Sequence, residues 1–429
     1  MREMKGSGIE WIGQIPKGWE LRRAKTLFTQ RNSKGNGIEV LLSPTQKYGV
    51  VPQSQLEGVV QVKEDTDLQM FKTVHKGDFV ISLRSFQGGF EYSLYEGVCS
   101  PAYQVFYPTS PICDTYYRYL FKSQSFISKM NNLTVGIREG KNIQYVDFAN
   151  SQIPVPPLAE QERIAAFLDA ECAEIDAVLE KTRASIEEYK KLKQAVITQA
   201  VTKGIRGDRP MKDSGIEWIG DIPGSWEVSS VRYIGQLQNG ISKGGEFFGK
   251  GFPFVSYGDV YKNYELPHSV SGLIDTTEDE RATYSVEYGD IFFTRTSETI
   301  EEVGFSCVCK RSIPNATFAG FIIRLRPFCA DEKILTDYAK YYFRGEHIRA
   351  YLVKEMNLVT RASLGQTLLK GMSVIVPPKS VQKEIAEYLD DKCADIDALV
   401  AKKQQYLTEI ENYKKSLIYE YVTGKKEVV

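Results

Sequence analysis

The chain has little histidine, no C-x-x-C pair of cysteines and no long apolar run. Its 429 residues include three histidines and seven cysteines, none of them in a C-x-x-C pair. Zinc sites are usually built from closely spaced cysteines and histidines, so the sequence argues against one. No apolar segment approaches the roughly 20 residues that cross a bilayer, and the N-terminus lacks the apolar core of a signal peptide. We therefore expect a soluble, cytoplasmic protein with reduced cysteines.

An excess of charge of either sign is also missing. The 54 lysines and arginines face 55 aspartates and glutamates, a formal net charge of −1. This balance excludes a broadly basic surface of the kind that holds many nucleic-acid-binding proteins on their ligand. The charge is unevenly distributed, because residues 1–157 carry a net +4 and residues 206–378 a net −2. Only the first of these two segments is mildly basic.

Catalytic motifs are sparse. The glycine-rich run 244–251 resembles a phosphate-binding loop, but Gly251 stands where a serine or threonine would hold magnesium. Glu139 and Lys141 have the spacing of some nucleases without an evident acidic partner. There is no clear methyl-donor loop, and three scattered histidines make a hydrolytic triad improbable. The sequence predicts a binding protein with no catalytic residues and no metal site.

The chain does contain an internal duplication. Residues 5–20 return as residues 212–227 at an offset of 207, and all four tryptophans lie in this repeated segment. Residues 156–176 return as residues 377–397 at an offset of 221, so the intervening insert is 14 residues longer in the second half. A repeated frame with divergent inserts predicts one scaffold that presents two different recognition surfaces.

Each insert is followed by a segment that predicts a long helix. Residues 158–203 contain neither proline nor glycine, and apolar residues recur every three or four positions; residues 379–422 keep the same register. Proline pairs precede both segments, and Gly204 and Gly424 provide C-terminal stops. A helix this long needs a partner for its apolar stripe, and the other copy is the obvious one. We expect an antiparallel pair that spaces two globular domains; a plain core bundle is the alternative.

The inserts predict mixed α/β domains. Residues 21–155 and 228–376 are rich in Tyr, Phe, Val and Gly, with strand-like runs bounded by turns. A tyrosine-rich helix is expected in each, around Thr115–Ser128 and Leu335–Val353. The predicted fold class is α+β: two mixed α/β domains in tandem, each followed by a long helix, with the helices paired as an antiparallel coiled coil under internal pseudo-two-fold symmetry.

Polar loop residues at corresponding places in the two inserts are candidates for reading DNA. Arginine can fork onto guanine, and asparagine or glutamine onto adenine; an exposed structural side chain is the alternative at each position. The candidates in the first insert are Lys47, Tyr48, Arg84, Ser85, Gln87, Arg138, Lys141 and Asn142. The candidates in the second insert are Ser256, Tyr257, Asp259, Arg295, Ser297, Arg361 and Ser363.

With these features the chain resembles the specificity subunit of type I DNA restriction–modification enzymes over essentially its whole length. One motif that supports this resemblance is Ser-Gly-Ile-Glu-Trp-Ile-Gly-x-Ile-Pro-x-x-Trp-Glu, at residues 7–20 and 214–227. The other is Pro-Pro-x-x-x-Gln-x-x-Ile-Ala-x-aromatic-Leu-Asp, at residues 156–169 and 377–390. The second copy departs by carrying Lys-Ser-Val at 379–381, where the first has Leu-Ala-Glu at 158–160. This difference leaves the local contacts at the second helix start open.

The resemblance implies a non-catalytic subunit that recognises an asymmetric, bipartite site in double-stranded DNA. Its parts would be target-recognition domain 1 (residues 1–157), a central helix (158–205), target-recognition domain 2 (206–378) and a C-terminal helix (379–429). The helices would set the spacer and dock two DNA adenine methyltransferase subunits, which two motor/nuclease subunits can join in the cytoplasm of a prokaryote. S-adenosylmethionine, ATP and Mg would belong to those partners. The alternative is a coiled-coil scaffold that joins two ligand-binding domains without touching DNA.

Overall fold

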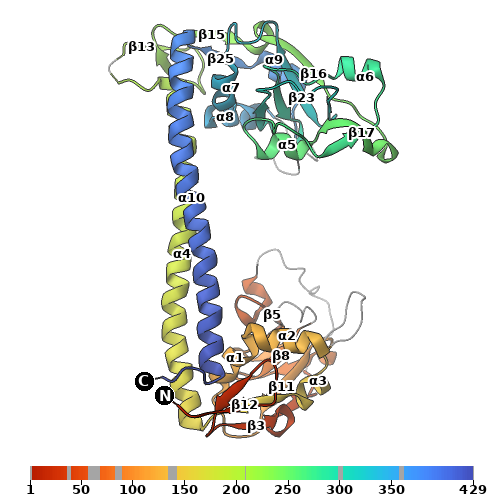
Figure 1. Cartoon of the computed structure of the whole chain (residues 1–429), viewed down its shortest axis with the longest axis vertical. Helices are drawn as coiled ribbons and strands as arrows, with labels where there is room; N and C mark the ends of the chain where they lie inside the picture. The colour runs from red at the N-terminus through yellow and green to blue at the C-terminus, as the bar shows by residue number, and fades with distance from the viewer. Residues whose placement is uncertain are drawn as a thin grey trace. The chain divides into compact units, whose positions relative to one another are not determined.

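The computed structural model describes residues 2–35, 40–56, 68–82, 89–133, 143–207, 209–297, 303–356 and 362–428. It divides into two compact units. The first unit comprises residues 1–183 and 405–429, and the second comprises residues 184–404. Each unit therefore contains one insert together with parts of both long helices (Figure 1).

The two long helices confirm the sequence prediction. Helix α4 spans Leu158–Lys203, and α10 spans Lys379–Val422. Each is followed by a glycine in the left-handed region, Gly204 at φ +82° and Gly424 at φ +70°, a conformation that favours glycine and ends a helix.

The helices pack side by side in antiparallel orientation within each unit. In the first unit, the later residue of α4 contacts the earlier residue of α10: Asp176 pairs with Lys414, and Arg183 with Glu411. In the second unit Lys193 of α4 pairs with Asp397 of α10. The apolar stripe is buried at most of its expected positions, including Leu168, Leu179 and Ile186 of α4. The predicted antiparallel pair is confirmed.

The first unit is built on a four-stranded antiparallel sheet in the order β4-β11-β8-β9. These strands are β4 (Phe28–Arg31), β11 (Gln104–Pro108), β8 (Phe79–Ile81) and β9 (Phe90–Tyr92). The small sheets are β1 (Met4–Gly6) with β2 (Gln14–Pro16), β3 (Glu20–Arg23) with β12 (Gln152–Val155), β5 (Leu42–Thr45) with β6 (Gly49–Pro52), and β7 (Lys72–Val74) with β10 (Gly97–Cys99). The helices are α1 (Asp114–Lys122), α2 (Gln124–Leu133) and α3 (Tyr145–Asn150), with 3-10 turns η1 (Ala24–Thr26), η2 (Gln53–Gln55) and η3 (Leu68–Met70).

The second unit repeats this frame with a larger insert. Its central antiparallel sheet has the order β16-β23-β19-β21. These strands are β16 (Gly235–Asn239), β23 (Ile322–Pro327), β19 (Ile291–Thr294) and β21 (Ser306–Val308). The other strands are β13 (Met211–Asp213) with β14 (Asp221–Pro223), β15 (Glu227–Ser230) with β25 (Ser373–Val376), β17 (Phe248–Val255) with β18 (Gly272–Ile274) and β22 (Thr317–Phe318), and β20 (Thr296–Ser297) with β24 (Ala362–Ser363). The helices are α5 (Tyr257–Lys262), α6 (Glu278–Thr283), α7 (Thr336–Tyr342), α8 (Glu346–Glu355) and α9 (Gln366–Gly371), with 3-10 turns η5 (Val231–Tyr233) and η6 (Gly245–Phe247). The predicted α+β class, with a long helix after each mixed domain, is confirmed.

The tyrosine-rich helix expected in each insert is two helices. In the first unit α1 ends at Lys122 and α2 begins at Gln124, because Ser123 adopts an extended conformation (φ −67°, ψ 138°). In the second unit the break between α7 and α8 falls at Gly345, which is extended at φ −69° and ψ 152°. The amphipathic spacing continues across each break, so periodicity alone does not reveal it.

The duplicated sequence makes duplicated tertiary contacts. Gln161, at the start of α4, accepts a hydrogen bond from the backbone N–H of Cys113 and donates one to the carbonyl of Pro156. Gln382 makes the same two kinds of contact with Leu335 and Pro377. In each unit this glutamine therefore connects the start of the long helix to the N-terminus of α1 or α7 and to the proline turn directly before the long helix.

Both chain ends lie in the first unit (Figure 1). The Lys425 ammonium donates a 2.6 Å hydrogen bond to the Ile12 carbonyl, and the hydroxyl of the fully buried Tyr116 donates a 2.7 Å bond to the carbonyl of Val422. In the second unit the Tyr338 hydroxyl donates to the Val201 carbonyl in the same way. The core of the first unit therefore needs the C-terminal end of α10.

Candidate nucleic-acid interface

The candidate interface of the second unit lies at one end of its central sheet. The register places Asn239, at the end of β16, opposite Ile323, and Thr294, at the end of β19, opposite Ile322. The antiparallel order brings the segments that leave these strands to the same edge. Loops at the end of a rigid sheet are a common place for binding residues.

Backbone hydrogen bonds connect four separate segments at this edge. Ala319 N–H donates to the Val255 carbonyl at 3.1 Å, and Arg295 N–H donates to the Phe321 carbonyl at 2.9 Å. Leu364 N–H donates to the Arg295 carbonyl at 2.7 Å, and strands β20 and β24 pair beside it. The sequence candidates Arg295, Ser297 and Ser363 are therefore neighbours, and Ser256 directly follows the strand that reaches the same edge.

Arg295 is distinguished from its neighbours by its side chain, and its contact with DNA stays a prediction. Its side chain is half-buried and forms no hydrogen bond or ion pair with any other described residue. Ser363, paired through its strand with Thr296, is exposed. Phe321 also lies here with 63% of its surface exposed, and the sequence candidates do not include it. A glycine followed by an aromatic residue between two strands is the signal that could have identified Phe321.

The other three candidates of the second unit that the structure describes lie at a helix start. Ser256 is the N-cap of α5: its hydroxyl accepts from Asp259 N–H, while the Asp259 carboxylate accepts from Ser256 N–H at 2.8 Å. This reciprocal capping box satisfies two backbone donors at the helix start. The Tyr257 ring stacks on Tyr261 with ring centres 5.9 Å apart. Contacts of these three residues with DNA remain a prediction.

Lys47 and Tyr48 occupy the tight turn between β5 and β6 in the first unit. The Tyr48 N–H donates to the Thr45 hydroxyl at 3.0 Å, and Gly49, at φ +73°, completes the turn. The Lys47 ammonium lies 4.9 Å from the centre of the Tyr48 ring, which is 61% exposed. An exposed aromatic ring beside a cation can stack on a base or contact a phosphate.

Seven sequence candidates lie outside the described residues: Arg84, Ser85, Gln87, Arg138, Lys141, Asn142 and Arg361. The residues that flank 83–88 are described, and Ser82 N–H donates to the Gly89 carbonyl at 2.8 Å. Strand β8, which precedes this segment, pairs with β9 through Ile81 and Phe90. It is the counterpart of β19, which precedes Arg295.

Two other arginines near the sheets have structural roles. The Arg31 guanidinium binds both carboxylate oxygens of the buried Asp78, at 2.7 and 3.0 Å, and covers the Tyr107 ring. In the second unit Arg326 binds both oxygens of Asp290, at 2.7 and 2.6 Å. Burial raises the pKa of Asp290, while the Arg326 guanidinium opposes that rise. Each aspartate follows a glycine, Gly77 or Gly289, in a turn that both units contain. The arginine that binds it comes from β4 in the first unit and from β23 in the second.

No candidate metal site and no membrane-spanning helix occur in the part of the chain that the structure describes. No group of three or more His, Cys, Asp or Glu side chains there could hold a metal ion. None of the described helices is long and apolar enough to cross a membrane.

Comparison with known proteins identifies the family to which the two repeated domains belong. A family model described as the type I restriction modification DNA specificity domain matches residues 16–188 and again residues 223–411, well over half of the chain. The specificity subunit of the type I restriction enzyme StySPI from Salmonella potsdam is 25% identical over 319 residues, 74% of this chain and 66% of that protein. The EcoKI specificity subunit of Escherichia coli K12 is 25% identical over 324 residues, 74% of this chain and 67% of that protein. The matched part thus spans about two thirds of the length of these relatives.

A solved structure has the same fold. It comes from work on complex assembly and conformational transition of the type I R-M system. The two chains share a TM-score of 0.71 at 16% identity, over 96% of this chain and 99% of the other. The resemblance drawn from the repeated motifs is confirmed: the chain belongs to the family of type I restriction–modification DNA specificity domains, which it contains twice.

Proposed function

We propose that the chain is the non-catalytic, DNA-reading subunit of a type I restriction–modification complex, with each unit reading one half of an asymmetric, bipartite site. The observation that supports this proposal is that the two units share the same central sheet and long helices but carry different residues at the ends of their sheets. Arg295 and its neighbours lie at the sheet end of the second unit. The first unit presents the exposed Lys47–Tyr48 turn between β5 and β6. The family match favours this function over a scaffold without DNA contact.

The long helices are the proposed docking surface for two DNA adenine methyltransferase subunits. The apolar side chains on them that are 40–55% exposed include Val178, Leu192, Leu399 and Tyr413. The 221-residue offset relates Val178 to Leu399 and Leu192 to Tyr413. Exposed apolar groups of this kind mark interaction sites when they gather on one surface.

The helix register groups these four side chains into two pairs. Val178 is two residues from Asp176 and Tyr413 directly precedes Lys414, so the ion pair of Asp176 with Lys414 places Val178 and Tyr413 at the same level of the helix pair in the first unit. The ion pair of Lys193 with Asp397 does the same for Leu192 and Leu399 in the second unit. Two equivalent surfaces on one chain suit two copies of one partner, which is the stoichiometry we propose. The motor/nuclease subunits would join through this assembly.

The chemistry of the complex would reside in those partners. We propose that S-adenosylmethionine binds the methyltransferase subunits and that ATP and Mg bind the motor/nuclease subunits, all in the cytoplasm. This chain would position the partners on DNA, and its near-neutral charge fits a subunit that shares phosphate contacts with them.

Measuring DNA binding by the chain with and without the methyltransferase tests whether specific binding needs the partner subunits. We expect the purified chain to bind duplex DNA weakly, with little preference for sequence. The complex with the methyltransferase expressed from the same locus should bind its bipartite site at least 10³-fold more tightly than unrelated DNA, as specific DNA binders do. Replacing Val178 and Leu399 together by glutamate should abolish assembly, while the exposed pair Glu180 and Lys402, replaced by alanine, should leave it intact. Tight, specific binding by the chain alone would contradict the proposal.

A further inference from the structure

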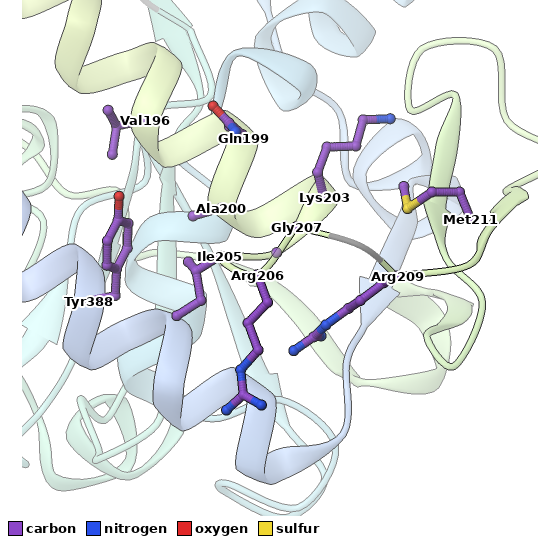
Figure 2. A pocket seen from close by; sticks show the side chains of 11 residues that line it. Val196, Gln199, Ala200, Lys203, Ile205, Arg206, Gly207, Arg209, Met211 and Tyr388 are labelled. Atoms are coloured by element: carbon purple, nitrogen blue, oxygen red, sulfur yellow. The ribbon is translucent and has the colours of Figure 1, made fainter.

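A pocket of about 420 Å³ opens in the second unit, where α4 ends and the chain turns towards β13 (Figure 2). Its apolar lining includes Val196, Ala200 and Ile205, together with Tyr388 of α10. Arg209 contributes a basic group to the lining, as does Arg206, whose guanidinium pairs with the Glu384 carboxylate at 2.5 Å. Figure 2 shows Lys203, another lining residue, pointing away from both arginines. The pocket is thus apolar on one side and basic on the other.

The first unit has an aromatic ring at the equivalent place. The 221-residue offset relates Ala200 to Tyr421 and Tyr388 to Phe167. In the first unit the Tyr421 and Phe167 rings pack together with centres 4.4 Å apart. In the second unit Ala200 is too small to cover the Tyr388 ring, and both residues line the pocket. The pocket therefore lacks the aromatic side chain that Tyr421 provides at the equivalent position of the first unit.

The second unit also lacks a carboxylate that the first unit has. In the first unit Glu160 accepts a 2.9 Å hydrogen bond from the indole N–H of the buried Trp19 and pairs with Arg2. The equivalent of Glu160 in the second unit is Val381, which cannot accept either contact.

This replacement leaves two polar groups without their expected partner. The indole N–H of the fully buried Trp226, the equivalent of Trp19, has no hydrogen-bond partner among the described residues. Arg209, the equivalent of Arg2 at an offset of 207, forms no ion pair with another described residue. The Trp226 ring lies against Gly204, which lines the pocket together with Arg209. A carboxylate that bound both Trp226 and Arg209 would therefore lie at this pocket. A buried donor without a partner destabilises the protein, and a bound carboxylate would supply the missing acceptor.

We propose that this pocket binds an extended segment of a partner protein that carries an aromatic side chain and a carboxylate. The ring would stack on Tyr388, as Tyr421 stacks on Phe167, and the carboxylate would bind Arg209, as Glu160 binds Arg2. In the first unit Glu160 and Phe167 are seven residues apart along α4, a rise of about 10 Å. Three residues of an extended peptide span this distance. Because the first unit supplies both groups itself, the site occurs once per chain. The proposal rests on the duplication and not on DNA reading.

The test uses the full-length chain and a fluorescein-labelled peptide, Glu-Ser-Ser-Tyr-Ser-Ser-Glu, followed by fluorescence anisotropy. We expect saturable binding of one peptide per chain, with a Kd of about 100 µM or tighter, which is modest for a short flexible segment. The same peptide with alanine in place of tyrosine, or with lysine in place of both glutamates, should bind at least tenfold more weakly.

Variants of the chain separate the two contacts. Ala200→Tyr and Val381→Glu each install the group that the first unit has, so each should weaken peptide binding at least tenfold without lowering Tm. Phe167→Ala, the matched change to Tyr388→Ala in the other unit, should leave binding unchanged, while Tyr388→Ala should weaken it. No saturable binding to the wild-type chain, or equal binding by Ala200→Tyr, would overturn the proposal. So would binding of adenosine monophosphate in place of the peptide, because the site would then hold a nucleotide.

Discussion

Lys193 and Asp397 form an ion pair through both carboxylate oxygens, at 2.8 and 2.6 Å, and the chain forms this pair twice. Its repeat is Lys414 with Asp176, at 2.6 and 2.7 Å, and the 221-residue offset relates both lysines and both aspartates. Each pair joins α4 to α10. The duplicated helices therefore recognise each other through the same two side chains in both units.

Reversing one of these ion pairs should destabilise the helix pairing. Lys193→Asp places two like charges together, and we expect it to lower the free energy of unfolding by about 1 kcal/mol, the upper part of the range for exposed pairs, since Lys193 is 15% exposed. Adding Asp397→Lys should restore part of that loss, which urea unfolding would measure. Lys191→Asp, at an exposed position, is the control. A double variant no more stable than Lys193→Asp would show that the pair contributes nothing.

Removing the carboxylate of Glu160 should reproduce the second unit's deficiency in the first. Glu160→Val leaves the buried Trp19 indole N–H without its acceptor and Arg2 without its partner. We expect a loss of about 1–3 kcal/mol in unfolding free energy, measured by urea denaturation. Glu162→Val changes a neighbouring exposed side chain and should cost far less. Equal effects of the two changes would argue against this role for Glu160.

His347 should make the second unit sensitive to acid. Its imidazole is buried between the rings of Trp218 and Tyr342, and burial lowers its pKa to about 3. The unfolded chain takes up a proton near pH 6.5, so the stabilisation is fully present above that pH and is lost as the pH falls towards 3. His347→Phe should flatten this dependence, which hydrogen exchange of the second unit as a function of pH would reveal. An unchanged profile in the variant would contradict the assignment.

Glu91 should give the first unit the opposite pH dependence. Burial raises its pKa to about 7, although the Lys122 ammonium lies 2.5 Å from its carboxylate. The unfolded carboxyl loses its proton near pH 4.5, so the stabilisation is present below that value and is lost as the pH rises towards 7. Glu91→Gln should remove this loss and make the first unit relatively more stable at pH 8. A steeper decline in the variant between pH 5 and 7 would show that another group is responsible.

The long helices could be predicted from the sequence almost to the residue. A proline-free, glycine-free stretch with a regular apolar stripe has few alternatives, and the proline pairs and Gly204 define its limits. The break between α1 and α2 could not be predicted, because Ser123 interrupts the helix without interrupting its apolar period. Local periodicity reports which face is buried and not whether the backbone stays helical.

The candidate site was predictable only in part. Arg295 and Ser363 could be chosen from their loop-like setting, but their adjacency depends on the pairing of β20 with β24, which lie 65 residues apart. Ser256 and Asp259 have the spacing of a capping box, and the structure shows that their side chains form one. The contact of Glu160 with Trp19 joins residues 141 positions apart, so no local pattern indicates it.

Methylation mapping of cellular DNA tests the central claim, that each unit reads a different half of one site. Cells carrying the wild-type chain should show adenine methylation at one asymmetric, bipartite motif, and deletion of the gene should abolish it. Arg295→Ala should relax the bases of one half only, because a lost arginine–guanine contact costs about 1–3 kcal/mol of discrimination. Arg311→Ala, an exposed arginine beyond the opposite end of the same sheet, should leave the motif unchanged. Equal relaxation of both halves by Arg295→Ala, or a motif that does not depend on this chain, would contradict the account.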